Sequence, residues 1–210
     1  MLIRKTFPVP PLNCNCSILG DSVTKRAIVV DPGGAHERIL QEVHALGLTV
    51  ERIIHTHAHF DHFLASGEMK EATGAVLCLH PDDAELWAHL ETQCRMFGVP
   101  YRPVPPPDYW LKDEEPLQVG GVEGRALHTP GHTPGSMCFW FEQDRLLLAG
   151  DTLFRGGIGR TDLWGGNYGA IEHSIRQRLY TLPEATSVIA GHGPDTVIGF
   201  EREYNPFVNG

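Results

Sequence analysis

A run of histidine and aspartate residues at positions 55–62 carries several side chains that bind metals. The run reads His-Thr-His-Ala-His-Phe-Asp-His, with imidazoles at His57, His59 and His62 and a carboxylate at Asp61. Nitrogen and oxygen donors of this kind bind borderline-soft divalent metals such as zinc. The preceding residues 51–54 have the pattern of a strand. We therefore predict a metal site where that strand ends.

A run of four donors does not by itself complete the predicted site. Three more candidate donors lie at turns elsewhere in the sequence. His132, Asp151 and His192 each follow an apolar stretch and a glycine. Glycine allows the backbone to turn sharply after a strand, so that the next side chain can point inward. We predict that all three lie at the same edge of the sheets as residues 55–62.

The periodicity predicts an α/β protein in which strands and then helices occur once in each half. In the first half we predict strands at 2–9, 14–19, 26–30, 51–55 and 75–79, and helices at 39–46, from about Asp61 or His62, and from Pro81. In the second half we predict strands at 117–119, 122–128, 136–141, 145–148 and 187–190, and helices at 171–179 and after Gly199. Two such layers predict a single domain, residues 1–210, in which two mixed sheets pack face to face with helices outside.

The segment 99–108 contains five prolines and is predicted to be a stiff surface loop that borders a substrate pocket. Five scattered cysteines, an odd number, favour reduced thiols over a disulfide framework. The first residues lack the pattern of a signal peptide, and no apolar run is long enough to cross a bilayer. These features predict a cytoplasmic protein with no membrane partner. The formal net charge of −9 disfavours nucleic acid as a partner.

The seven donors match the metallo-β-lactamase superfamily in type and order, and the predicted architecture resembles its αββα sandwich. That resemblance implies two divalent metal ions, with zinc expected and iron or manganese as alternatives. By the same resemblance His57, His59 and His132 hold one ion, Asp61, His62 and His192 hold the other, and Asp151 bridges them. Asp61 and Asp151 are thus the candidate catalytic residues.

Within the superfamily, residues 150–162 and 191–199, together with Glu201, Asn205-Pro206 and Phe207, resemble glyoxalase II-like proteins. The chain looks like a short form without the C-terminal glutathione-binding domain. The resemblance implies a thioesterase that acts on S-D-lactoylglutathione or a similar small thioester through a metal-bridging hydroxide. Residues 158–162 depart from the usual glutathione-contacting stretch, which leaves glutathione recognition open.

Arg155 and Arg160 are candidates to bind a substrate carboxylate, because guanidinium groups match its geometry. Arg160 has an alternative role, which is to pair with Asp162 and brace the loop. His55 and His128 end strands near predicted ligands and are candidates to orient them. The histidines on predicted helices, His36, His44, His89 and His173, are expected to be structural or solvated.

Two rival functions remain open at the level of sequence. The chain also resembles persulfide dioxygenases, in which a single iron would lie on His57, His132 and Asp151, and two histidines with one carboxylate suit non-haem iron chemistry. The other rival is a nonenzymatic metal-binding module on the same scaffold. The oligomeric state is not predicted.

Overall fold

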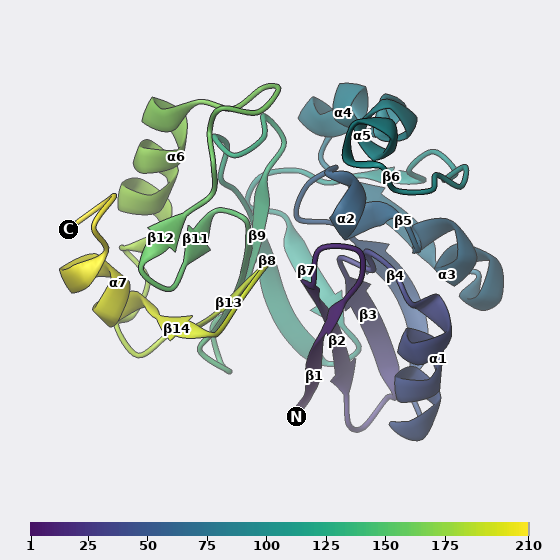
Figure 1. Cartoon of the computed structure of the whole chain (residues 1–210). Coiled ribbons are helices and arrows are strands. Elements are labelled where there is room, and N and C mark those ends of the chain that lie inside the picture. The colour runs from purple at the N-terminus through teal and green to yellow at the C-terminus, as the bar shows by residue number, and fades with distance from the viewer. Residues whose placement is uncertain (210) are drawn as a thin grey trace. The chain divides into compact units, whose positions relative to one another are not determined.

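The computed structural model describes residues 1–209, which form two compact units. Unit 1 contains residues 1–111 and 118–122, and unit 2 contains residues 112–117 and those from 123 onward. The ribbon in Figure 1 shows strands and helices in both units. We describe each unit by itself.

Unit 1 is built on a sheet with the strand order β1-β2-β3-β4-β5-β6. The strands are β1 (Leu2–Val9), β2 (Cys14–Asp21), β3 (Arg26–Val30), β4 (Thr49–Ile54), β5 (Val76–Leu79) and β6 (Tyr109–Trp110). The β1/β2 and β2/β3 pairs are antiparallel, whereas β3 to β6 run parallel to one another. Parallel strands end at the same edge of a sheet, so the segments after β3, β4 and β5 are neighbours.

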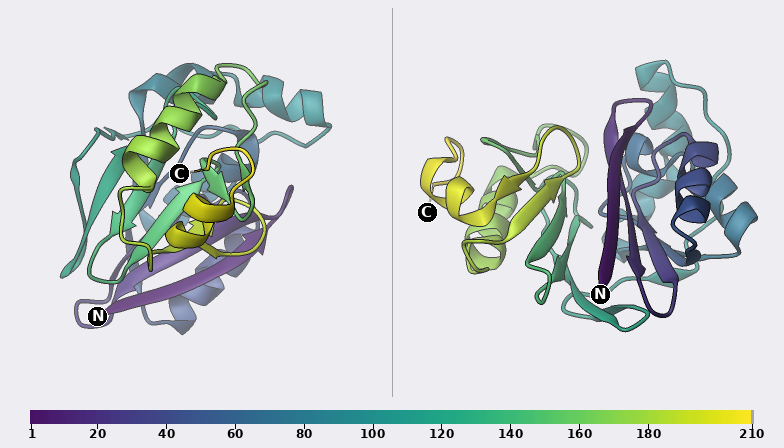
Figure 2. Two further views of the ribbon diagram at one scale, coloured as in Figure 1. Left: turned by 90° about the vertical axis from the view of Figure 1, so that its left-hand side faces the viewer. Right: turned by 90° about the horizontal axis from the view of Figure 1, so that it is seen from below.

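Helices lie beside this sheet in Figure 1 and in the right-hand view of Figure 2. They are α1 (His36–Ala45), α2 (Phe60–Phe63), α3 (Ser66–Thr73), α4 (Ala84–Ala88) and α5 (Leu90–Phe97), with a 3₁₀ turn η1 (Pro81–Asp83) before α4. Both α1 and α3 pack against β4. Buried Ile39 and Met69 from these helices join alternate strand residues such as Ile53 and Leu77 in one apolar core. This packing fixes the strand from which residues 55–62 emerge.

The sheet of unit 2 has the strand order β14-β13-β10-β9-β8-β7. Its strands are β7 (Pro116–Val119), β8 (Val122–His128), β9 (Met137–Phe141), β10 (Leu146–Gly150), β13 (Ser187–Ala190) and β14 (Thr196–Val197). A separate hairpin consists of β11 (Leu153–Phe154) and β12 (Gly157–Ile158). Helix α6 (Tyr168–Ser174) continues into a π-helical turn η2 (Ile175–Leu179), and α7 (Ile198–Tyr204) follows β14. Ile171, Ile175 and Leu179 from α6 and η2 pack into the core of this unit.

The predicted class, two mixed sheets with helices, is confirmed, and the predicted strands agree with the observed ones to within a few residues. The helix predicted from Pro81 is instead three pieces, and its last break falls at His89, whose Nδ1 bonds the Glu85 carbonyl at 2.8 Å. The helix predicted near Asp61 is likewise two helices, α2 and α3. The short strands β6, β11, β12 and β14 were not predicted. Within residues 1–209, no helix has the length and apolar character to span a membrane.

A turn stabilised by Asp21 gives unit 1 an expected sensitivity to acid. The Asp21 carboxylate accepts hydrogen bonds from the backbone N–H groups of Gly121, Val23 and Thr24 at 3.0, 3.1 and 3.2 Å, and from the Thr24 hydroxyl at 2.8 Å. These bonds, that from Gly121 first, hold the pKa of Asp21 well below its usual value. A carboxyl whose pKa is lower in the folded state stabilises the fold above its unfolded pKa, and this contribution is lost as the pH falls.

We therefore expect the free energy of unfolding to fall more steeply in the wild type than in Asp21→Asn between about pH 5 and about pH 2.5, a range that includes the unfolded Asp pKa of about 3.9. Urea titrations at several pH values measure this difference. Asp144→Asn, at an exposed position, is the control and should follow the wild type. Equal acid slopes in Asp21→Asn and wild type would contradict the expectation.

Candidate metal centre

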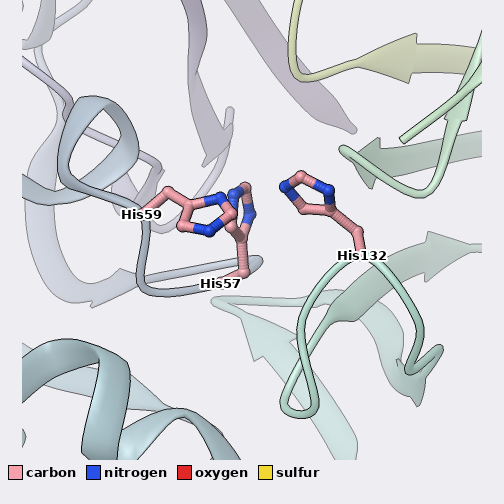
Figure 3. Close-up of side chains that lie close together, drawn as sticks. All are labelled: His57, His59 and His132. Atoms are coloured by element: carbon pink, nitrogen blue, oxygen red, sulfur yellow. The ribbon is translucent and has the colours of Figure 1, made fainter. Parts of the chain in front are cut away.

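The segment after β4 presents His57 and His59 before the chain enters α2 (Figure 3). The His57 and His59 rings have centroids 4.8 Å apart at 88°, and the His57 and His62 rings lie 4.1 Å apart. The Asp61 Oδ2 lies 3.7 Å from the His62 Nε2. His57, Asp61 and His62 are buried, with exposed fractions of 1%, 5% and 0%. The structure thus gathers the four predicted donors of unit 1 at the end of one strand.

The backbone between His57 and His59 is fixed from both sides. The N–H of Ala58 donates to the Asp83 carboxylate at 2.9 Å, and its carbonyl accepts from the Gln93 side-chain amide at 3.1 Å. The same Gln93 amide accepts from the N–H of Phe60 at 3.1 Å. Asp83 and Gln93 come from η1 and α5, and the sequence did not predict either as part of the site.

Asp31, which directly follows β3, orients two of the histidines. Its carboxylate accepts from the Thr56 N–H at 2.8 Å, the Thr56 hydroxyl at 2.6 Å and the His62 Nδ1 at 3.0 Å. Because the Thr56 hydroxyl gives its only proton to Asp31, it accepts from the His57 Nδ1, 3.0 Å away. Both rings therefore carry their proton on Nδ1, which leaves the lone pair of Nε2 for a metal.

A close backbone approach supports this arrangement. A Cβ on Gly33 would lie 1.6 Å from the Asp61 carbonyl oxygen. Only glycine at position 33 therefore allows the turn after Asp31 to reach helix α2, which carries Asp61.

Cys14 lies beside this network, with its Sγ 3.3 Å from the His62 Nδ1. Donor atoms of Cys14, Asp31 and His62 all lie within 4.8 Å of one another. Burial, however, raises the pKa of the Cys14 thiol to about 12. Because the Cys14 thiol lies on the Nδ1 side of the His62 ring and not at Nε2, Cys14 belongs with the groups that pack around His62.

Unit 2 brings its three predicted donors together. His132 lies on the loop after β8 (Figure 3), Asp151 follows β10 and His192 follows β13. β10 runs parallel to β13, and two successive antiparallel pairings make β8 parallel to β10, so the three segments share one sheet edge. The Asp151 Oδ2 lies 3.6 Å from the His132 Nε2 and 3.8 Å from the His192 Nε2.

The chain after β12 orients His132. The His132 Nδ1 donates to the Arg160 carbonyl oxygen at 2.8 Å, which again leaves Nε2 as the metal-binding nitrogen. A Cβ on Gly159 would lie 1.8 Å from the Asp151 carbonyl oxygen and 3.0 Å from the His132 Cβ. Glycine is thus required where this segment passes between two predicted ligands.

The remaining candidates differ in their contacts. Arg160 forms two hydrogen bonds of 2.8 Å with the Asp162 carboxylate, which is the alternative role predicted for it. Arg155 is exposed at the turn between β11 and β12. The His128 Nε2 donates to the Pro134 carbonyl at 2.8 Å and so holds the loop that carries His132.

His55 is a buried structural residue. Its ring nitrogens contact the Cys78 carbonyl at 3.0 Å and the Ser66 hydroxyl at 2.7 Å, and the ring stacks on Phe63. Burial lowers the pKa of His55 to about 4, which keeps the ring neutral at physiological pH.

These imidazoles use Nδ1 for a hydrogen bond and lie next to carboxylates. Imidazole Nε2 atoms and carboxylate oxygens are ligands that suit divalent metals. The chain belongs to the metallo-β-lactamase superfamily, whose family model matches residues 9–192, and it has the α/β fold of that family. Among curated relatives, the hydroxyacylglutathione hydrolase GloC of Haemophilus influenzae is 39% identical over 205 residues, which are 97% of this chain and 96% of that protein.

The chain is also similar to several solved structures. The BLEG-1 B3 metallo-β-lactamase has a TM-score of 0.91 at 36% identity, with 99% of this chain and 100% of that one covered. TTHA1623 in a di-iron-bound form has a TM-score of 0.88 at 34% identity, with 96% and 98% covered. ETHE1 from Myxococcus xanthus has a TM-score of 0.81 at 28% identity, with 97% and 83% covered.

Proposed function

We propose that the chain is a metal-dependent hydrolase, and specifically a thioesterase of glyoxalase II type that acts on S-D-lactoylglutathione or a similar small thioester. The observation that carries this proposal is the 39% identity to the hydroxyacylglutathione hydrolase GloC over nearly the full length of both chains. The donor chemistry described above is compatible with it.

We further propose that the seven predicted donors hold two divalent ions. His57, His59 and His132 would hold one ion, Asp61, His62 and His192 would hold the other, and Asp151 would be a ligand shared by both. Bound metals of this kind lower the pKa of water to about 7 and polarise the carbonyl that is attacked. Zinc fits the donor set, and the di-iron form of TTHA1623 makes iron an alternative.

The residues of the chain have two tasks in this mechanism. Asp31, Thr56 and the Arg160 carbonyl hold three imidazole rings through Nδ1, which leaves Nε2 as the nitrogen that would bind a metal. Asp61 and Asp151 supply the negative charge that holds the cations. The leaving thiolate has a low enough pKa to depart without a dedicated general acid.

Arg155 is the proposed contact for a substrate carboxylate, because the guanidinium of Arg160 already pairs with Asp162. We keep Arg160 as a weaker candidate for the same role. The proposed partner is thus a small thioester, with neither nucleic acid nor membrane, and the proposed compartment is the cytoplasm.

The test is a panel of assays on purified protein of measured metal content. We expect release of thiol from S-D-lactoylglutathione, its loss after treatment with a strong chelator, and its return when zinc is added. Arg155→Ala should raise KM and leave kcat nearly unchanged, whereas exposed His44→Ala should match the wild type. Thiol release that survives complete metal removal would overturn the proposal.

Two further substrates decide between this proposal and its rivals. Oxygen uptake with glutathione persulfide by iron-loaded protein, without thioester turnover, would favour the dioxygenase alternative, to which the similarity with ETHE1 draws attention. Hydrolysis of a chromogenic cephalosporin alone would favour a β-lactamase, the activity for which BLEG-1 is named. A metal-binding protein that is silent with all three substrates would favour a nonenzymatic module.

A further inference from the structure

A buried carboxylate in α7, Glu201, contacts the hairpin that follows Asp151. Glu201 has an exposed fraction of 0%. Its Oε2 accepts from the Gly156 N–H at 2.9 Å and from the Asn205 side-chain amide at 2.9 Å, and its Oε1 accepts from the Thr196 hydroxyl at 2.5 Å. A buried charge is tolerated only where such donors compensate its lost hydration.

Asn205 completes the contact from the other side of the hairpin turn. Its side-chain amide also donates to the Gly157 carbonyl at 3.1 Å, while its side-chain oxygen accepts from the Phe207 and Val208 N–H groups at 3.0 and 3.3 Å. Together Glu201 and Asn205 bind one backbone donor and one backbone acceptor on consecutive residues of the hairpin.

The hairpin leads directly to the contacts of two predicted ligands. Three residues beyond Gly156, Gly159 packs against the backbone of Asp151, and the next residue provides the carbonyl that accepts from the His132 Nδ1. Residues 153–158 form only two-residue strands, which have little stability of their own. Their position therefore depends on what holds them from outside.

We infer that Glu201, with Asn205, is a positioning residue that fixes the 153–160 segment and thereby the orientation of His132. All of these groups belong to unit 2. The series of contacts from Glu201 through the hairpin to His132 is observed in the structure. Its effect on metal binding rests on the proposed function. Neither residue touches a donor atom of the proposed site, so their role would act entirely through the backbone of the hairpin.

Glu201→Ala tests the inference, and Glu201→Gln is its conservative partner. The glutamine can keep its carbonyl oxygen toward Gly156 and Asn205 and turn its amide toward Thr196, whose hydroxyl can reverse and accept. Glu203→Gln, at an exposed position on the same helix, is the control. Thr196→Val removes one of the three donors and provides a milder variant if Glu201→Ala does not fold.

Two readouts need neither metal nor substrate. Amide hydrogen exchange across residues 153–160 reports the hairpin, and the ¹⁵N shifts of the His132 ring report whether Nδ1 still carries the proton. In Glu201→Ala we expect exchange to rise by at least about tenfold, as expected when local opening becomes easier, and the ring to become a mixture of tautomers. Glu201→Gln should restore most of both signals, and Glu203→Gln should equal the wild type.

Zinc retention against a chromogenic chelator is the third readout. Loss of the hydrogen-bond partner of a metal-binding histidine lowers metal affinity about 10–100-fold. We therefore expect the zinc affinity of Glu201→Ala to fall by an amount near the lower end of that range. Unchanged exchange across 153–160, or faster exchange with an unaltered His132 ring, would overturn the inference. A wild-type protein that binds no zinc would overturn the proposed function, and the first two readouts would still decide the role of Glu201.

Discussion

Asp151→Ala is expected to reduce thiol release at least about 10³-fold, because the metal-dependent stabilisation of the transition state amounts to several kcal/mol. Asp151 lies 3.6 and 3.8 Å from the Nε2 atoms of His132 and His192. Its carboxylate is the only acidic group among the three predicted ligands of unit 2. Its removal leaves two neutral imidazoles to hold a cation, so the bound metal per chain should fall as well.

The measurement is kcat/KM with S-D-lactoylglutathione together with metal content by atomic emission. Asp151→Asn keeps the shape of the side chain but offers a neutral amide, and it should resemble Asp151→Ala. Exposed Asp144→Ala is the matched control. Full activity at full metal content in Asp151→Ala would rule out the bridging role.

Replacement of Asp31 is expected to have the second largest effect, because this one carboxylate serves two predicted ligands. It binds the His62 Nδ1 directly and the His57 Nδ1 through the Thr56 hydroxyl. Loss of such a contact costs about 10–100-fold in metal affinity or activity. Since two histidines lose their orientation, Asp31→Gly should lie toward the upper end of that range.

The backbone at Asp31 determines which substitutions are informative. Asp31 has a φ of 51°, a conformation that glycine and asparagine adopt more readily than alanine. Asp31→Gly therefore removes the carboxylate without added backbone strain, and Asp31→Asn keeps one acceptor oxygen and should fall between Asp31→Gly and the wild type. Thr56→Val separates the route to His57 from the route to His62. Wild-type zinc affinity in Asp31→Gly would show that the carboxylate does not orient the ligands.

Much of the scaffold was predictable because its elements are long and strongly patterned. The strands β2 and β3 carry apolar residues and end at turn residues, and Ile171, Ile175 and Leu179 recur at helical spacing. The predicted donors could be recognised for a related reason, since they follow strands at turns. The sequence could not predict that the segment at Ile175 takes a π-helical turn, in which the Tyr180 N–H bonds the Ile175 carbonyl five residues back.

The residues that the sequence did not predict as part of the site mostly make polar contacts with segments that are distant in sequence. Asp31 does not stand out in the sequence, since an aspartate before Pro32 and two glycines is typical of a turn. A signal did exist, because Asp31 directly follows a strand that pairs with β4. Asp83 and Gln93 gave no comparable signal, because they reach Ala58 from 25 and 35 residues away. The two-residue strands β11 and β12 are too short for any periodicity.

The three imidazoles held through Nδ1 have three different acceptors. His62 donates to a carboxylate, His57 to a hydroxyl and His132 to a peptide carbonyl. An anionic acceptor draws the Nδ1 proton most strongly and leaves the ring richest in electrons, so the three Nε2 atoms differ in basicity. The three histidines therefore differ in how strongly Nε2 donates electrons, according to the group that accepts from Nδ1. His62, whose acceptor is a carboxylate, is the strongest electron donor of the three.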